Sequence, residues 1–250
     1  MYEVSAEVLE SIGRDGYAVI YDVVESETLS KLAELLENSN APGTIRRNGS
    51  IYAIRNLLES VPAVRELAES PSIRDFAEMV LGANCRAVRA TLFDKRPEAN
   101  WKVPWHQDLT ITVEQRVNVE GFGPWTEKAG VCHVQAPVDV LEGMLAMRIH
   151  LDDCSEASGP LRILPGSHLH GRLGDATIQQ WRQTCRAVSC AVGRGGVIAM
   201  RPLLLHSSSA SAHPLRRRVI HLEFAARELR GGLCWYQGSR TTDHGQLTKG

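Results

Sequence analysis

Residues 85–93 read CRAVRATLF, and residues 105–108 read WHQD. The first stretch is apolar over a strand's length and predicts a β-strand that leads toward the second. Similar runs occupy residues 145–151, 196–200 and 219–224, and Gly/Pro clusters separate the runs. Many short strands divided by such turns are typical of a β-sandwich or jelly roll. The second half of the chain is therefore expected to be mainly strands.

The first third of the chain is predicted to be mainly helical. Apolar side chains recur at helical spacing in residues 5–13, from residue 26 onward, and in residues 70–80. A short strand is expected at residues 17–20 between the first two helices. Ser5 and Ser26 are the expected N-caps of those helices. Helices of this kind can pack against one face of a sheet, which predicts an α+β fold.

A single domain over residues 1–250 is the simplest organisation for a chain of this length. Its helical part would cover about residues 1–82 and its jelly-roll core about residues 83–226. Residues 109–143 show no clear regular structure. Long loops in compact domains are usually functional, so a lid-like loop over the site near His106 is expected here.

The composition excludes several classes of protein. A formal net charge of −1 provides no overall basic field for binding nucleic acid or an anionic membrane. No apolar run reaches the length of a spanning helix. Acidic residues interrupt the first 14 residues, which therefore lack the continuous apolar stretch of a signal peptide. The six cysteines are scattered without a C-x-x-C pair, which is typical of reduced thiols. A soluble, cytoplasmic protein is expected.

His106 and Asp108 form an H-x-D motif. Residues i and i+2 of an extended chain project from the same face, so both side chains can reach one ion while Gln107 points away. A lone H-x-D triplet also arises by chance, so the motif needs a third ligand.

His206 is the candidate third ligand, because it ends the apolar stretch 201–206 and small polar residues follow it. Two histidines and a carboxylate on one face of an ion leave three positions open, as in non-haem Fe(II) oxygenases. Taken alone, His206 is more typical of a strand-end histidine that is satisfied by local hydrogen bonds.

Three arginines open the strand that follows. Strand alternation places Arg217 with His221, opposite Ile220 and Leu222, so Arg217 can face a cavity. The planar guanidinium of arginine matches a carboxylate in a bidentate pair. Arg216 is the rival, because a one-residue slip would exchange the two faces.

At these residues the chain resembles the phytanoyl-CoA dioxygenase family, whose pattern is H-x-D, a distant histidine and an arginine about ten residues later. Residues 158–168, SGPLRILPGSH, resemble the turn between two jelly-roll strands in that family. The resemblance covers roughly residues 15–224. It implies a double-stranded β-helix core of the cupin-like type with flanking N-terminal helices.

The resemblance also implies the site and its chemistry. His106, Asp108 and His206 would bind Fe(II), Arg217 would bind the distal carboxylate of 2-oxoglutarate, and Ser208 would assist the arginine. With O₂, the enzyme would hydroxylate or otherwise oxidise an unactivated C–H bond of a small organic substrate, releasing succinate and CO₂. The intact Asp108 favours hydroxylation, since related halogenases replace this carboxylate by a small residue.

Two other functions are compatible with parts of the pattern. A Zn(II) hydrolase would use the same ligands to activate water, but it would need a general base and has no use for an internal Arg217. A catalytically silent jelly-roll binding protein would leave both ligands and arginine without a purpose.

The substrate and the oligomeric state do not follow from the sequence. One candidate substrate clamp consists of aromatic and cationic residues, namely Trp101, Trp105 and Trp125 with Lys102, Arg116 and Lys128. They could hold an apolar substrate that bears an anionic or carrier-linked group. Packing of the aromatic rings in the core and solvation of the charged loop explain them equally well. His133 lies in polar, loop-like surroundings and is expected at the surface.

Overall fold

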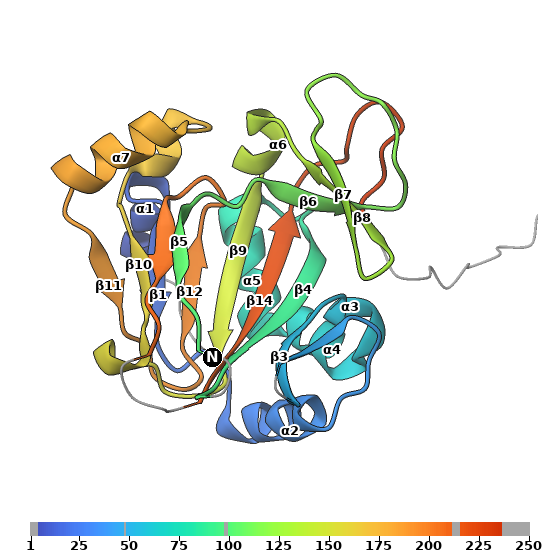
Figure 1. Cartoon of the computed structure of the whole chain (residues 1–250), viewed down its shortest axis with the longest axis vertical. Coiled ribbons are helices and arrows are strands. Elements are labelled where there is room, and N and C mark those ends of the chain that lie inside the picture. The colour runs from blue at the N-terminus through green and yellow to red at the C-terminus, as the bar shows by residue number, and fades with distance from the viewer. Residues whose placement is uncertain (1–4, 48, 98–99, 212–215, 237–250) are drawn as a thin grey trace, which may run out of the picture.

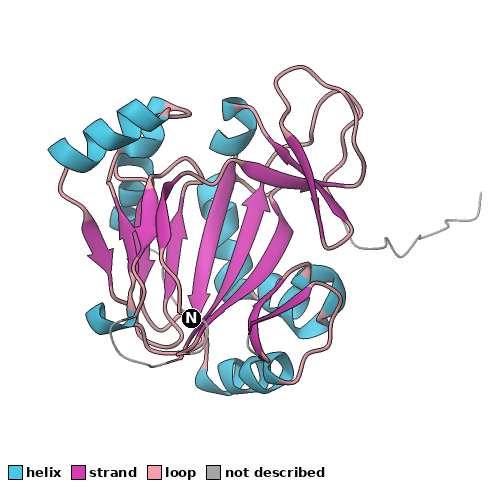
Figure 2. Ribbon diagram, viewed as in Figure 1, coloured by secondary structure: helices cyan, strands magenta, loops and turns pink. Residues whose placement is uncertain are grey.

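The structure, a computed structural model, describes residues 5–47, 49–97, 100–211 and 216–236. Its centre is a seven-stranded antiparallel sheet (Figures 1 and 2). In spatial order the strands are β1 (Tyr17–Ile20), β12 (Val197–Met200), β9 (Met144–His150), β14 (Arg217–Ala225), β4 (Arg86–Lys95), β3 (Ser50–Ile54) and β2 (Thr44–Arg47).

A four-stranded antiparallel sheet packs against part of the large one. Buried Ala146 and Ile198 of the large sheet share a hydrophobic cluster with Leu161 and Ile163 of the small sheet. Solved relatives described below share this architecture, so the predicted jelly-roll core is confirmed. In spatial order the small sheet contains β11 (Val188–Cys190), β10 (Leu161–Ile163), β13 (His206–Ser208) and β5 (Val103–His106).

Residues 109–143 differ from the irregular loop that the sequence predicted. They form a three-stranded sheet and a short helix beside the large sheet (Figure 1). Buried polar residues, Thr112 on one strand and His133 on its neighbour, hid the strand pattern. The elements are β6 (Thr110–Val113), β7 (Trp125–Lys128), β8 (Val131–Gln135) and α6 (Val138–Glu142).

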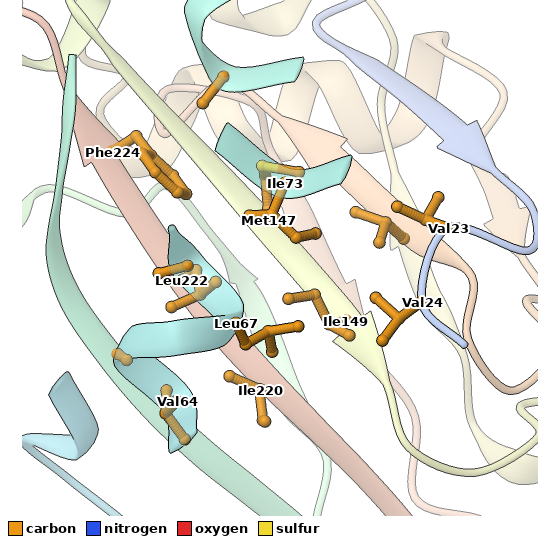
Figure 3. Packing of buried hydrophobic residues seen from close by; sticks show 14 of the residues in the cluster. Val23, Val24, Val64, Leu67, Ile73, Met147, Ile149, Ile220, Leu222 and Phe224 are labelled. Carbon is orange, nitrogen blue, oxygen red and sulfur yellow. The ribbon is translucent and has the colours of Figure 1, made fainter. Parts of the chain in front are cut away.

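The helices of the N-terminal part cover the face of the large sheet that points away from the small sheet. Figure 3 shows Ile149, Ile220 and Leu222 of that face packed around Leu67 and its neighbours. Burial of these aliphatic side chains is the main force that holds the layers together. The covering helices are α1 (Ala6–Arg14), α2 (Ser26–Glu37), α3 (Leu57–Ser60), α4 (Pro62–Ala68) and α5 (Pro71–Leu81).

Most predicted elements of the N-terminal part are present. The hydroxyl of Ser5 accepts a hydrogen bond from the backbone N–H of Val8 and caps α1. Helix α2 begins one residue earlier than predicted, since Glu25 occupies its N-cap position instead of Ser26. Strands β2 and β3 were not predicted. The remaining helical segments are η1 (Glu156–Ser158), η2 (Ser167–His170) and α7 (Asp175–Thr184).

No helix in the described part of the chain combines the length and the apolar character needed to cross a membrane.

Candidate active site

His106 and His206 are direct cross-strand partners on the antiparallel pair β5 and β13. Their ring centroids are 4.2 Å apart. Asp108 follows two residues after His106, and its backbone N–H donates to the carbonyl of Pro202, which ties it to the segment that leads into β13. One ligand atom from each of the three side chains lies within 4.8 Å of the others, which is the spacing of a potential metal site.

Both histidines are oriented in the same way. The Nδ1 of His106 lies 2.8 Å from the carbonyl oxygen of Pro104, and the Nδ1 of His206 lies 2.9 Å from that of Leu204. A carbonyl can only accept, so each Nδ1 carries the proton and each Nε2 presents its lone pair. Metal-binding histidines are usually fixed by such a bond from the other ring nitrogen.

The two Nε2 atoms face Asp108. Each lies 3.6 Å from a carboxylate oxygen of Asp108, which is longer than a hydrogen bond. Two imidazole nitrogens and a carboxylate suit Fe(II) chemically. The residues present therefore fit the metal that the family pattern implies.

Burial and neighbouring groups set the protonation of these ligands. Burial lowers the pKa of His206 to about 4, so its imidazole is neutral at neutral pH. Burial would raise the pKa of Asp108, but the adjacent imidazoles of His206 and His106 outweigh it and hold that pKa well below its ordinary value. Burial would lower the pKa of His106, but the adjacent carboxylate of Asp108 outweighs it and raises that pKa above its ordinary value. His206 therefore offers a neutral nitrogen and Asp108 an anionic oxygen, while a metal ion would compete with a proton for His106.

Gln107 points away from the triad, as strand alternation predicts. Its side-chain nitrogen donates to the carbonyls of Gly171 and Leu203 at 2.8 and 2.7 Å, and its oxygen accepts from the backbone N–H of Leu173. These three bonds tie the segment that carries His106 and Asp108 to two other parts of the chain.

The triad lies in a cavity with two lobes. The inner lobe, about 260 Å³, lies between the two sheets and contains Arg217 and Ser208. The outer lobe, about 330 Å³, opens toward β3 and the hairpin of β7 and β8. His106 and Asp108 line both lobes, so the candidate metal site is at their junction.

The inner lobe ends in a group of cations. Arg217 is buried and donates to the carbonyl of Gly159 at 2.8 Å, while its Nε has no hydrogen-bond partner. Lys95 donates to the hydroxyl of Ser208 at 3.1 Å and to a backbone carbonyl at 2.8 Å. Burial and repulsion by Arg217 and Arg148 lower the pKa of Lys95 to about 7. Among the described residues, no carboxylate pairs with Lys95, Arg148 or Arg217.

Arg216 lies outside the cavity. It pairs with Glu37 and with Asp94, whose carboxylate it contacts at 2.7 Å. The register of β14 thus places Arg217 and His221 in the cavity and Arg216 in a separate ion-pair cluster.

Arg148 and His221 are further polar residues of the inner lobe. The guanidinium of Arg148 lies 3.2 Å from the Nδ1 of His221, whose Nε2 faces a carboxylate oxygen of Asp108 at 3.9 Å. Burial and repulsion by Arg217 lower the pKa of Arg148 to about 10. Sequence reasoning missed Arg148. The available signal was an isolated arginine within the apolar run 144–151, because such a cation needs a polar surface to face.

The lining of the two lobes bears on two expectations, the surface position of His133 and the substrate clamp. His133, expected at the surface, is buried on β8 and lines this lobe. Of the aromatic and cationic residues considered as a substrate clamp, Trp101 lines the inner lobe and Lys128 the outer lobe. Trp105 instead stacks with Arg162, and Trp125 with Arg116.

The chain is similar to known proteins over most of its length. The model of the phytanoyl-CoA dioxygenase family matches residues 12–219. L-proline trans-4-hydroxylase from Streptomyces griseoviridis is 23% identical, over 88% of this chain and 87% of its own length. Ectoine dioxygenase from Bordetella parapertussis is 25% identical over 66% of this chain, which spans about half (49%) of that relative.

Among solved structures, the apoform of EctD from S. alaskensis superposes with a TM-score of 0.70 at 20% identity. The match covers 89% of this chain and 77% of EctD. This likeness establishes the fold, and the family match extends from α1 to β14 and includes all three candidate ligands. The chain therefore belongs to the phytanoyl-CoA dioxygenase family, which confirms the predicted class of Fe(II)- and 2-oxoglutarate-dependent dioxygenases.

Proposed function

We propose that this enzyme holds Fe(II) with His106, Asp108 and His206, and oxidises a C–H bond of a small organic substrate placed in the outer lobe. One observation carries the proposal: a His-Asp-His triad shares one cavity with a cationic end that has no carboxylate partner among the described residues. When bound, Fe(II) with 2-oxoglutarate and O₂ supplies the oxidising chemistry, in which 2-oxoglutarate becomes succinate and CO₂.

The inner lobe suits the cosubstrate. We assign the distal carboxylate of 2-oxoglutarate to Arg217 and Lys95, with Ser208 orienting the ammonium group of Lys95. The carboxylate would supply the negative charge that these cations lack, and it would accept from the unbonded Nε of Arg217. The keto-acid end would then extend toward His106 and Asp108 at the junction of the lobes.

The other residues of the cavity position and shield the reaction. Phe93, Val103 and Leu161 form apolar walls that limit access of water to the reacting carbon. His221, whose Nδ1 lies 3.2 Å from the guanidinium of Arg148, borders Asp108 from the large sheet.

The metal-dependent hydrolase fits the cavity less well. A hydrolase that activates water on the metal would have no use for the buried cations Arg217 and Lys95 at the inner end of the cavity. A silent binding protein would not need the cationic inner end. Proline and ectoine, named in two relatives, are small molecules, which favours a free small-molecule substrate.

The test is the conversion of 2-oxoglutarate to succinate without added substrate. The wild-type enzyme should form succinate only with both Fe(II) and O₂, and Asp108→Ala should form none. Equal succinate formation by Asp108→Ala and wild type would contradict the assignment of the ligands.

A further inference from the structure

The outer lobe contains two cations that the proposed chemistry does not use. Arg55 follows β3, and Lys128 ends β7 at the tip of the β7–β8 hairpin. Neither side chain has a hydrogen bond or ion pair with another described residue. Arg89, which lines both lobes, is different, because it forms an ion pair with buried Glu223 and donates to the carbonyl of Thr110.

The surroundings raise the energetic cost of these two charges. Arg55 is half-buried and Lys128 is exposed at the hairpin tip. Partial burial and repulsion by Arg55 and Arg89 nevertheless lower the pKa of Lys128. Burial also lowers the pKa of Arg55, with a second contribution from Arg89. Like charges held together beside a cavity favour a bound anion. The chain as a whole is close to neutral, so this positive potential is local.

The framework around the two cations is built by contacts between distant segments. Asn56, in a left-handed conformation directly after Arg55, contacts the carbonyl of Ala129 through its side-chain amide at 3.5 Å. This contact joins the hairpin tip to the end of β3 and so holds Lys128 near Arg55. His133, buried behind them, donates from Nδ1 to the carbonyl of Val131. Its Nε2 is thus an acceptor and adds no third positive charge.

We propose that the substrate is an organic anion whose carboxylate or phosphate group binds between Arg55 and Lys128. This inference rests on the proposed function, since it assigns the substrate's place in the same cavity. The outer lobe shares Thr91, Phe93 and Asp108 with the inner lobe. A substrate anchored at its charged end would therefore place its carbon chain near the triad, while 2-oxoglutarate occupies the inner lobe.

The anion site can be tested by calorimetry with inorganic phosphate and, separately, with acetate. The protein is loaded with Fe(II) and saturating 2-oxoglutarate without oxygen, so that the inner lobe is filled. We expect Arg55→Gln and Lys128→Gln each to weaken binding of the preferred anion about tenfold, the loss of one charge-assisted contact. The double variant should abolish binding. The anion that binds with the lower Kd, phosphate or acetate, identifies the class of anionic group that the site prefers.

Arg116→Gln is the matched control. Arg116 is a cation near the same hairpin, but it stacks on Trp125 and lines neither lobe. Its substitution should leave anion binding unchanged. The proposal is overturned if the loaded wild type binds neither anion at millimolar concentration, or if the double variant binds as well as wild type.

The spectroscopic titration of Fe(II) with 2-oxoglutarate separates this proposal from the proposed function. The charge-transfer band should persist in Arg55→Gln and Lys128→Gln, because neither residue lines the inner lobe. Loss of the band in these variants would assign the two cations to the cosubstrate and overturn the proposal. If wild type shows no band, the proposed function fails, and the calorimetry is repeated on metal-free protein to judge the anion site alone.

Discussion

His106 and His206 lie directly opposite each other on neighbouring antiparallel strands, and each donates its Nδ1 proton to the backbone carbonyl two residues earlier. The local backbone thus fixes both rings in the same tautomer. Because 100 positions separate the two residues in the sequence, the pairing of β5 with β13 is what creates the site. The two histidines therefore come together only when the small sheet forms.

Removal of any ligand should abolish turnover and weaken iron binding. His106→Ala and Asp108→Ala each leave two of the three protein donors, which lowers the affinity for the ion and disrupts the geometry that turnover needs. Iron content after desalting and succinate formation measure the effect. His170→Ala, which removes an exposed histidine on η2, is the control and should retain both. Full iron content in Asp108→Ala would show that the carboxylate is not a ligand.

Arg217→Ala should weaken 2-oxoglutarate binding about 10- to 100-fold, as expected for loss of a buried charge-assisted bond worth about 1.5–3 kcal/mol. Arg216→Ala should leave that affinity unchanged and lower the thermal midpoint, because Asp94 is fully buried and would lose one of its two arginine partners. Titration of each variant with 2-oxoglutarate decides between them. The reverse pattern would assign the cosubstrate to Arg216.

Binding of 2-oxoglutarate should take up a proton at about pH 8 and take up almost none at about pH 6. Burial and two neighbouring arginines lower the pKa of Lys95 to about 7, so this lysine is mostly neutral at the higher pH. The incoming dianion raises that pKa and protonates the amine. Affinity should accordingly fall as the pH rises above about 7.

Calorimetry in buffers of different ionisation enthalpy measures this uptake. Lys95→Met should bind 2-oxoglutarate more weakly and should show no uptake at either pH. An uptake that persists in Lys95→Met would place the titrating group elsewhere in the cavity.

Gln107→Leu should lower the free energy of unfolding by about 2–4 kcal/mol, because it leaves the buried carbonyl of Leu203, the part-buried carbonyl of Gly171 and one backbone N–H without partners. Chemical denaturation measures the change. Gln107→Glu keeps an acceptor for the backbone N–H of Leu173, but its two contacts with carbonyl oxygens become repulsive. We therefore expect this variant also to have a lower free energy of unfolding than wild type. Wild-type stability in Gln107→Leu would mean that these bonds do not hold the segment in place.

Sequence patterns predicted the strands whose apolar side chains face the helices. The strands β4, β9, β12 and β14 were found because their side chains are buried on both faces or alternate cleanly. Strands β6 and β8 were missed because buried Thr112 and His133 occupy positions where the pattern requires apolar residues. His133 lines the outer lobe of the cavity, so at this position a residue of the site interrupts the apolar pattern of the strand.

The site was predictable where its residues form local motifs and unpredictable where the fold assembles it. His106 and Asp108 share a motif, and alternation placed Arg217 on the cavity side of β14. Lys95 precedes Arg96 at the end of its strand and resembles a solvated terminus in the sequence. Only the closure of the two sheets brings it to Ser208, 113 positions away. Long-range contacts of this kind leave no trace in local spacing.

The most direct test of the account is an anaerobic titration of the Fe(II)-loaded protein with 2-oxoglutarate, followed by visible absorption. Bidentate binding of the keto acid to Fe(II) produces a weak metal-to-ligand charge-transfer band. The account predicts that wild type and Arg216→Ala develop this band and that His206→Ala does not. Iron-loaded wild-type protein that binds 2-oxoglutarate without the band, or a band that survives in His206→Ala, would contradict it.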